Sequence, residues 1–370
     1  MENGRKRIVL CVVGARPNYM KVAPIHAALL ASRHFSPRLI HTGQHYDPEM
    51  NDAFFTELGM PRPDANLEVG SGSHAVQTAE VMKRFEPILE AHPDAITLVV
   101  GDVNSTLACA LVAVKRGQPV LHVEAGLRSG DRAMPEEINR ILTDQISDLL
   151  FTTERKAAAN LGREGIDPDK IHFVGNVMID SLKANLARAV PPAETFARAG
   201  CAGPPAFAVA TLHRPSNVDD PVVLKGLLET FGRIGESLPV VFTIHPRTRA
   251  RIAAAGLDPL LDGVRVIALP PAGYLTMLGL MAGARMVLTD SGGIQEETTA
   301  LGIPCLTLRG NTERPITVEE GTNTLVGADR DRILAVVAEI LAKGGKAGRI
   351  PELWDGAAAK RIVAVMEERF

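Results

Sequence analysis

Short apolar runs alternate along this chain with longer segments in which apolar residues recur every three or four positions. The first runs, rich in β-branched residues, occupy residues 8–13, 37–41, 96–100, 120–123 and 149–152. Runs of this length are typical of buried strands, and the periodic segments between them are typical of amphipathic helices. The alternation predicts a parallel sheet with helices on both faces.

The same alternation then starts again. A second series of apolar runs occupies residues 207–211, 240–244, 264–268, 286–289 and 305–308. Residues 171–180 and 189–205, the latter rich in Ala, Pro and Gly, are interpreted as a linker helix and loop. We therefore expect an α/β protein with two Rossmann-like, doubly wound domains facing a cleft, at residues 1–176 and 177–354. The helical segment 355–370 is expected to pack back on the first domain.

The length supports two domains, because a chain of 370 residues exceeds the roughly 250–300 at which a single core stops growing. A net charge of -3 provides no positive field, so nucleic acid and anionic membranes are not expected partners. No G-x-G-x-x-G or P-loop sequence occurs, so a tightly held dinucleotide is not expected.

The sequence indicates neither a targeting segment nor a set of disulfide-bonded or metal-binding cysteines. The first apolar run is too short for a signal peptide, and no run reaches the roughly 18–20 residues that cross a bilayer. The four cysteines are scattered among mostly apolar neighbours, which favours reduced packing residues over disulfides or zinc ligands. We expect a cytoplasmic protein.

Polar residues that could bind phosphate follow several predicted strands. Ser291, Gly292 and Gly293 open a helix after residues 286–289, where backbone N–H groups and the helix dipole favour an anion. Glu297, further along that helix, is placed to accept hydrogen bonds from ribose hydroxyls. Arg314, in the loop after the next strand, suits bidentate phosphate recognition. The alternative for the Ser-Gly-Gly segment is an ordinary glycine turn with a capping carboxylate. The alternative for the segment that contains Arg314 is a solvated loop.

The first domain carries cations and carboxylates at its predicted strand ends. Arg16 and Lys21 follow the first strand, and both could reach a nucleotide phosphate. Asp102, Glu124 and Glu136 follow the middle strands, where crowded carboxylates acquire the raised pKa values that acid–base catalysis requires. Alternatively, Arg16 and Lys21 are ordinary surface cations, and the carboxylates are helix caps or salt-bridge partners.

Two histidines lie immediately beyond strands of the second series. His213, with its neighbour Arg214, is interpreted as a site residue at the cleft. His245 is a weaker candidate, because a single histidine at a strand end is more often a structural hydrogen-bonding residue. No H-x-x-x-H or H-E-x-x-H spacing occurs, so no metal site is expected.

An ordered set of motifs from Gly14 to Asn323 resembles the non-hydrolysing UDP-N-acetylglucosamine 2-epimerases. The set comprises G-A-R-P-N-x-x-K, T-G-Q-H, G-D-x-x-S-T, H-V-E-A-G-L-R-S-G, P-E-E-x-N-R, G-N-x-x-I-D, H-R-P-S-N, T-D-S-G-G-I-Q-E-E and T-E-R-P…G-T-N. The resemblance implies a GT-B-like architecture. It implies catalytic or substrate-contacting roles for Arg16, Lys21, Asp102, Glu124, Glu136, Arg140 and His213. It implies UDP contacts by Ser291, Gly292, Gly293, Glu297 and Arg314, and uracil contacts by Ala272 and Met277.

The resemblance also implies the reaction, which interconverts UDP-N-acetylglucosamine and UDP-N-acetylmannosamine by inversion at C2. Because this C–H bond is not adjacent to a carbonyl, a workable route expels UDP from C1 while a base takes the C2 proton. Reprotonation of the resulting 2-acetamidoglucal from the other face and return of UDP complete the inversion. Asp102, Glu124 and Glu136 are expected to share the acid and base roles, with His213 assisting. This route needs no cofactor, and a homodimer is expected by resemblance.

Other functions stay open at this point. A 2-epimerase of a related UDP-sugar, such as UDP-2,3-diacetamido-2,3-dideoxy-glucuronate, would keep these motifs. A GT-B-type glycosyltransferase, a hydrolysing variant and a non-catalytic nucleotide-sugar sensor are further alternatives. Some relatives are activated by a second substrate molecule through a Q-H-x-x-Q motif. Because this chain departs from that motif between Gln44 and Asp47, such activation is not expected.

Overall fold

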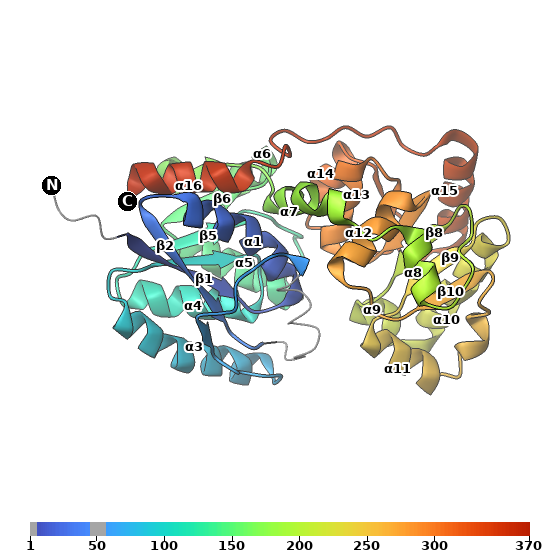
Figure 1. Cartoon of the computed structure of the whole chain (residues 1–370), viewed down its shortest axis with the longest axis horizontal. Coiled ribbons are helices and arrows are strands. Elements are labelled where there is room, and N and C mark those ends of the chain that lie inside the picture. The colour runs from blue at the N-terminus through green and yellow to red at the C-terminus, as the bar shows by residue number, and fades with distance from the viewer. Residues whose placement is uncertain (1–5, 45–56) are drawn as a thin grey trace. The chain divides into compact units, whose positions relative to one another are not determined.

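The structure, a computed structural model, describes residues 6–44 and 57–370. The chain divides into two compact units (Figure 1). Unit 1 comprises Met1–Ala184 and Glu352–Phe370, and unit 2 comprises Asn185–Pro351. The predicted boundaries were 176/177 and 354/355. No helix in the described parts of the chain combines the length and apolar character needed to span a membrane.

Unit 1 is built on a parallel sheet. Its strands, in spatial order, are β3 (Ala65–Asn66), β2 (Phe35–His41), β1 (Arg7–Val13), β4 (Ile96–Val100), β5 (Val120–Val123), β6 (Leu149–Thr152) and β7 (Ile171–Phe173). All five predicted strands are present. The interpretation of residues 171–173 as linker is wrong, because they form the edge strand β7, which pairs with β6. Three half-buried residues give too short an apolar run to reveal a strand.

The helices of unit 1 connect successive strands, except for the last two, which lie beyond β7 along the chain. They are α1 (Arg16–Ala31), α3 (His74–Ala91), α4 (Asn104–Lys115), α5 (Pro135–Ile146), α6 (Arg155–Arg163), α7 (Val177–Asn185) and α16 (Ala358–Arg369). One face of the sheet packs on α3 and α4, where Leu10, Val99 and Phe85 are fully buried. Each such side chain stabilises the fold by about 1.5–3 kcal/mol.

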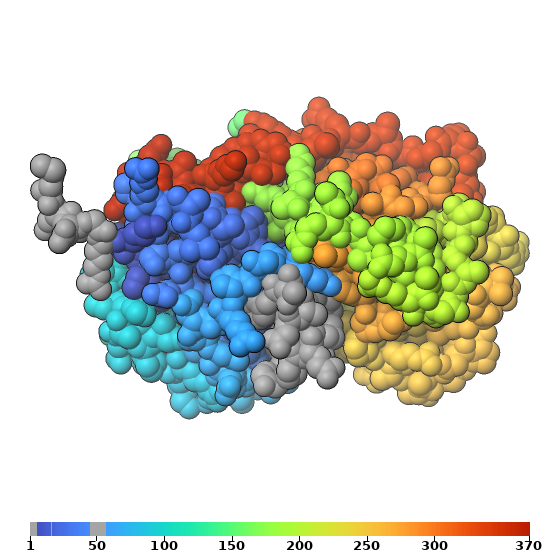
Figure 2. All heavy atoms as spheres, in the orientation of Figure 1, coloured from blue at the N-terminus to red at the C-terminus, as the bar shows by residue number. Residues whose placement is uncertain are grey.

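The C-terminal helix α16 belongs to unit 1. Its first N–H groups, those of Ala358 and Ala359, donate to the two carboxylate oxygens of Asp180 at 3.1 and 2.8 Å. Trp354, which is fully buried, donates its indole N–H to Thr153 O at 3.1 Å. The red C-terminal segment accordingly lies beside the blue N-terminal one in Figure 2.

Unit 2 contains a second parallel sheet. Its spatial order is β10 (Val266–Leu269), β9 (Val240–Thr243), β8 (Ala208–Thr211), β11 (Met286–Thr289), β12 (Cys305–Thr307) and β13 (Asn323–Leu325). In order along the unit this is 3-2-1-4-5-6, the order of dinucleotide-binding folds. The two sheets confirm the predicted α/β class with two Rossmann-like domains.

One predicted strand of unit 2 begins too early. Residues 264–268 were expected to be extended, but β10 starts at Val266. The carboxylate Oδ1 of Asp262 accepts the N–H groups of Val264, Arg265 and Val266 at 3.0, 2.7 and 3.1 Å. This turn holds the first two residues outside the sheet, and Val264 is therefore 74% exposed.

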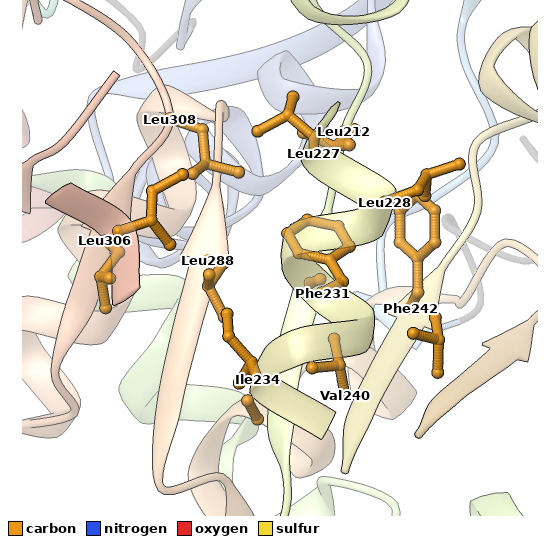
Figure 3. Close-up of a cluster of buried hydrophobic side chains, with 14 of the residues drawn as sticks. Leu212, Leu227, Leu228, Phe231, Ile234, Val240, Phe242, Leu288, Leu306 and Leu308 are labelled. Carbon is orange, nitrogen blue, oxygen red and sulfur yellow. The ribbon is translucent and has the colours of Figure 1, made fainter. Parts of the chain in front are cut away.

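The helices of unit 2 cover both faces of its sheet. They are α8 (Pro192–Arg198), α9 (Pro215–Val218), α10 (Pro221–Gly235), α11 (Pro246–Ala254), α12 (Tyr274–Gly283), α13 (Gly292–Leu301), α14 (Pro315–Glu319) and α15 (Arg330–Lys343). Phe231 and Ile234 of α10 pack in a cluster with Leu288 of β11 (Figure 3). The ring of Phe231 meets that of Phe242 edge to face at 5.6 Å.

Candidate functional site

Both sheets change direction at their first strand, and the predicted site residues lie there. In unit 1 the strands β2 and β4 flank β1, and in unit 2 the strands β9 and β11 flank β8. Ligands of such sheets bind outside the carboxyl ends of the strands at this switch point. Asp102 follows β4, His213 follows β8, and Ser291 follows β11. The topology therefore assigns one candidate site to each unit.

In unit 1, Asn18 joins the two loops of the switch point. Its Oδ1 accepts the N–H groups of Gly14 and Ala15 at 3.2 and 2.9 Å, and its Nδ2 donates to Val100 O at 3.1 Å. The side chain is almost fully buried. Sequence reasoning assigned Asn18 no role, although its position in the first turn of a helix was the available signal.

Lys21 and Glu124 form a buried ion pair beside this cross-link. Their side chains are 8% and 1% exposed. Glu124 has a φ of 68°, a left-handed conformation that costs a long side chain free energy and that occurs often at functional sites. A Cβ on Gly101 would lie 3.1 Å from Lys21 Nζ and 3.3 Å from Glu124 Oε2, so only glycine fits comfortably against the pair.

Asp102 is held by a second buried cation. Arg140 Nη1 donates to Asp102 Oδ2, while its Nε and Nη2 donate to Glu137 Oε2 at 3.0 and 2.6 Å. The Asp102 side chain is 27% exposed, whereas those of Arg140 and Glu137 are 2% exposed. Asp102 thus presents a fixed carboxylate that a ligand can reach.

Glu137 was named in a motif but assigned no role. Burial raises the pKa of Glu137, but the N–H of Ser129 and the Arg140 guanidinium outweigh burial and hold that pKa below its usual value. Glu136, the predicted site residue, is half-buried on the same helix. The sequence Glu-Glu alone could not tell which of the two carboxylates faces inward.

Two predicted features of unit 1 fall on undescribed parts of the chain. Helix α1 begins at Arg16, but the Arg16 side chain lies outside the described structure, as do His45 and Asp47. Gln44 is described, and its Oε1 accepts the backbone N–H and the hydroxyl of Ser105 at 3.0 and 2.7 Å.

In unit 2, Asp290 connects the two loops of the switch point. Its carboxylate accepts the N–H groups of His213 and Arg214, each at 3.0 Å, and the Nδ2 of Asn217 at 3.1 Å. Burial raises the pKa of Asp290, but the hydrogen bond and charge of His213 outweigh it, and the pKa lies below its usual value. Asp290 belonged to a quoted motif, yet sequence reasoning gave it no role.

His213 also contacts Asp290 through its ring. The Nδ1 atom lies 2.7 Å from Asp290 Oδ1, and the His213 side chain is 40% exposed. A carboxylate at this position fixes the tautomer with a proton on Nδ1. Nε2 is then the nitrogen that can exchange a proton with a ligand.

The Ser-Gly-Gly turn opens α13 as predicted from its sequence. Ser291 is the N-cap, and its N–H donates to Thr289 Oγ1 at 3.0 Å. A Cβ on Gly292 would lie 2.6 Å from Glu313 Oε1, so this carboxylate reaches the start of the helix. The predictions omitted Glu313.

Arginine side chains lie close to Glu313 at the start of α13. Arg309 Nη2 lies 2.9 Å from Glu313 Oε2, and Arg214 Nη2 lies 4.0 Å from Oε1. Burial raises the pKa of Glu313, but the charges of Arg314 and Arg309 outweigh it and hold the pKa well below the usual range. Arg314 itself pairs through Nε with Glu296 Oε1 at 2.8 Å, and both side chains are buried.

Glu297 lies in a different environment. It is 4% exposed, and burial raises its pKa to about 8 despite a hydrogen bond from the Tyr274 hydroxyl. Tyr274 is the first residue of α12, directly after the loop that contains Ala272. Met277 follows one turn later and, like Ala272, is partly buried. Glu297, the predicted ribose residue, is therefore in contact with Tyr274, which lies between the predicted uracil residues Ala272 and Met277 and was itself assigned no role.

His245 is exposed and caps a helix. Its Nδ1 accepts the N–H of Arg247 at 3.3 Å at the start of α11. The rings of His245 and His213 lie 6.4 Å apart, centroid to centroid. Among the described residues, no group of three or more His, Cys, Asp or Glu side chains is arranged to hold a metal ion.

Comparison with known proteins gives consistent matches. The family model described as UDP-N-acetylglucosamine 2-epimerase matches residues 27–367. The chain is 42% identical over 360 residues to a UDP-N-acetylglucosamine 2-epimerase of Methanocaldococcus jannaschii, covering 96% of this chain and 97% of the relative. It is 42% identical over 338 residues to a UDP-2,3-diacetamido-2,3-dideoxy-D-glucuronate 2-epimerase of Pseudomonas aeruginosa, covering 90% and 92%.

Solved structures agree with these matches. A crystal structure of the Methanocaldococcus jannaschii UDP-GlcNAc 2-epimerase in complex with UDP-GlcNAc and UDP superposes with a TM-score of 0.89 at 40% identity, covering 98% of this chain and 99% of that chain. The Neisseria meningitidis UDP-GlcNAc 2-epimerase bound to UDP-GlcNAc superposes with a TM-score of 0.86 at 28% identity, covering 98% and 100%.

Proposed function

The chain belongs to the UDP-N-acetylglucosamine 2-epimerase family, and from this premise we propose that it inverts C2 of a UDP-N-acetylhexosamine, interconverting UDP-GlcNAc and UDP-ManNAc. The observation that carries the proposal is a division of chemistry between the two switch points. Unit 1 presents carboxylates fixed by buried cations. Unit 2 presents a glycine-rich helix N-terminus beside arginines.

The proposed reaction has two balanced steps. A base removes the proton from C2 while the C1–O bond breaks, which leaves a C1=C2 double bond in the sugar and releases UDP. An acid then delivers a proton to C2 from the opposite face as the UDP oxygen re-forms its bond to C1. No oxidant or reductant is consumed.

In unit 1 we assign the proton transfers to Asp102, Glu124 and Glu136. Asp102 and Glu124 are each held by a cation, so their orientation is fixed before a substrate binds. Such preorganised groups at a reacting carbon contribute about 10²–10⁴-fold to the rate. Two carboxylates on different loops can serve the two faces of C2.

In unit 2 we assign the nucleotide to Ser291, Gly292, Gly293 and Glu297. The first N–H groups of α13 suit a diphosphate oxygen, since the helix dipole favours negative charge there. Arg214 and Arg309, both close to Glu313, add positive charge for the leaving UDP. His213, oriented by Asp290, is assigned to the diphosphate or to a proton transfer beside it.

A second substrate is supported by one observation. The chain is as similar to the Pseudomonas aeruginosa UDP-2,3-diacetamido-2,3-dideoxy-D-glucuronate 2-epimerase as to the archaeal UDP-GlcNAc enzyme. Both sugars share the acetamido group at C2 and the UDP at C1, so the same elimination applies to either. We further propose that the enzyme acts as a homodimer in the cytoplasm, as the family resemblance implies.

Incubation with each UDP-sugar in deuterated water tests the proposal. The C2 signal is followed by NMR, and the expected result is epimerisation of UDP-GlcNAc with one deuterium at C2 of the product. Inversion without deuterium would reject the elimination route. Turnover of the diacetamido sugar alone would assign the second substrate, and turnover of neither would overturn the proposed function. The Asp102→Asn variant controls for contaminating epimerase.

A further inference from the structure

A histidine and an aspartate are paired beneath the candidate carboxylates of unit 1. His122, in β5, and Asp144, in α5, are both fully buried. His122 Nδ1 lies 2.6 Å from Asp144 Oδ1, and His122 Nε2 lies 2.7 Å from Gly101 O. The mechanism proposed above uses neither residue.

The hydrogen bonds fix the orientation of this pair. Because a carbonyl oxygen only accepts, Nε2 carries a hydrogen and donates it to Gly101 O. The bond between Nδ1 and Asp144 forms whether its proton lies on the ring or on the carboxyl. Asp144 Oδ2 is occupied as well, since it accepts Gly126 N at 3.0 Å and lies 2.7 Å from Arg128 Nη2. Each side-chain nitrogen and oxygen of the pair thus has a partner.

The partners of the pair are the neighbours of two candidate catalytic residues. Gly101 directly precedes Asp102, and Gly126 follows Glu124 by two positions. Both glycines have positive φ, of 68° and 78°, as does Glu124 between them in the chain. A backbone in these conformations keeps its shape only when surrounding contacts hold it.

We propose that His122 and Asp144 are positioning residues, which fix the Gly101–Asp102 and Glu124–Gly126 turns so that both carboxylates address the same carbon. The proposal rests on the proposed function. It differs from a purely structural role because the hydrogen bonds run to the two turns at the carboxyl edge of the sheet. The opposite end of β5 is held separately, by Asp148 Oδ2, which accepts Val120 N at 2.9 Å.

Three variants separate the two bonds of the histidine. Glutamine places an amide nitrogen near the Nε2 position, so His122→Gln retains a donor for Gly101 O. Asparagine reaches only the Nδ1 position, so His122→Asn retains the contact with Asp144 alone. Asp144→Asn keeps the shape of the side chain but removes its charge. Asp148→Asn is the matched control, because it removes a carboxylate that accepts a hydrogen bond from the far end of β5.

For the wild type and each variant we would measure steady-state epimerisation, UDP binding by calorimetry and thermal unfolding. Misplacement of a reacting group by about 1 Å costs about 100-fold in rate. We expect kcat to fall about 100-fold in His122→Asn and Asp144→Asn, and about 10-fold in His122→Gln, with KM and the UDP Kd within about threefold. Asp148→Asn should keep kcat within about twofold.

The outcomes separate this proposal from the proposed function. If the wild type epimerises no UDP-sugar, the proposed function fails. If the wild type is active and the His122 and Asp144 variants keep their kcat, the positioning role is wrong. If kcat, UDP affinity and Tm fell together in every His122 and Asp144 variant, with no partial rescue by His122→Gln, the pair would be merely structural. This result would also overturn the proposal.

Discussion

The switch points of units 1 and 2 share a strand order but carry opposite arrangements of charge. In unit 1, buried cations hold carboxylates, as Lys21 holds Glu124 and Arg140 holds Asp102. In unit 2, a buried carboxylate, Asp290, holds the loop that carries His213. The fold therefore determines where a ligand binds, while the side chains at that place determine the chemistry.

The comparison also explains why neither site is a copy of the other. In unit 1 the pairing with Arg140 fixes the carboxylate of Asp102, and its 27% exposure leaves it open to a ligand. A diphosphate needs donors, and unit 2 provides the N–H groups of α13 and the arginines around Glu313. Changes in unit 1 should consequently affect kcat, and changes in unit 2 should affect UDP affinity.

Glu124→Gln should have the largest effect. The amide keeps the shape of the side chain but cannot accept the C2 proton, so we expect kcat to fall about 10³-fold. The UDP Kd, measured by calorimetry, should stay within about threefold, because the assigned nucleotide residues belong to unit 2. A kcat within tenfold of the wild type would remove Glu124 from the proton transfers.

A double variant separates catalysis from stability in that experiment. Glu124→Gln leaves the ammonium of Lys21 buried without its counter-charge, which costs about 3–5 kcal/mol. Lys21→Met combined with Glu124→Gln removes both charges and should recover most of the lost Tm. If the double variant regained turnover as well, the loss in the single variant would reflect folding and not chemistry.

Gly292→Ala should have the next largest effect, now on binding. The added Cβ would lie 2.6 Å from Glu313 Oε1, at the helix start where we propose that the diphosphate binds. We expect the UDP Kd to rise about tenfold or more, equivalent to about 1.4 kcal/mol. Gly232→Ala is the control, because no atom lies within 4 Å of a Cβ at that helix position. Equal UDP affinity in both variants would exclude the proposed anion site.

Much of the fold could be predicted from the sequence, because apolar runs report buried strands directly. The runs at residues 96–100, 120–123 and 286–289 match β4, β5 and β11 in full. The edge strands β3, β7 and β13 were not predicted. They have two or three residues and partly exposed faces, so they give no run long enough to detect.

The candidate site was predictable in place but not in detail. Strand ends indicated Asp102, Glu124 and His213, yet the residues that orient them depend on contacts distant in sequence. Asp290 and His213 are 77 positions apart, and Asn18 reaches the carbonyl of a residue 82 positions away. No local pattern records such pairings, so the sequence cannot tell an orienting carboxylate from a reacting one.

Glu297 makes unit 2 sensitive to pH. Its folded pKa of about 8 exceeds the ordinary value of 4.5, so between these values the folded protein binds a proton that the unfolded chain releases. This contribution to stability is complete below about pH 4.5 and disappears as the pH rises to 8. The slope reaches about 1.4 kcal/mol per pH unit. Thermal unfolding between pH 6 and 8 should show a steeper loss of stability with rising pH for the wild type than for Glu297→Gln.

Tyr274→Phe provides the control for that measurement. Its hydroxyl hydrogen bond lowers the pKa of Glu297, so its removal should raise this pKa further and extend the pH-dependent loss of stability above pH 8. Parallel pH curves for the wild type, Glu297→Gln and Tyr274→Phe would show that Glu297 does not titrate in this range.

We expect the smallest effect at His245. Two variants of this residue distinguish a helix cap from a ligand contact in unit 2. Its Nδ1 accepts the N–H of Arg247 at the start of α11, and asparagine can accept the same hydrogen bond. His245→Ala should therefore lower the free energy of unfolding by about 0.5 kcal/mol, and His245→Asn should change it by less, as measured by denaturant unfolding. Once asparagine has preserved the cap, any rise in the UDP Kd of that variant measures a contact between the imidazole and the nucleotide. Equal destabilisation by both variants would instead show that the cap contributes nothing to the fold.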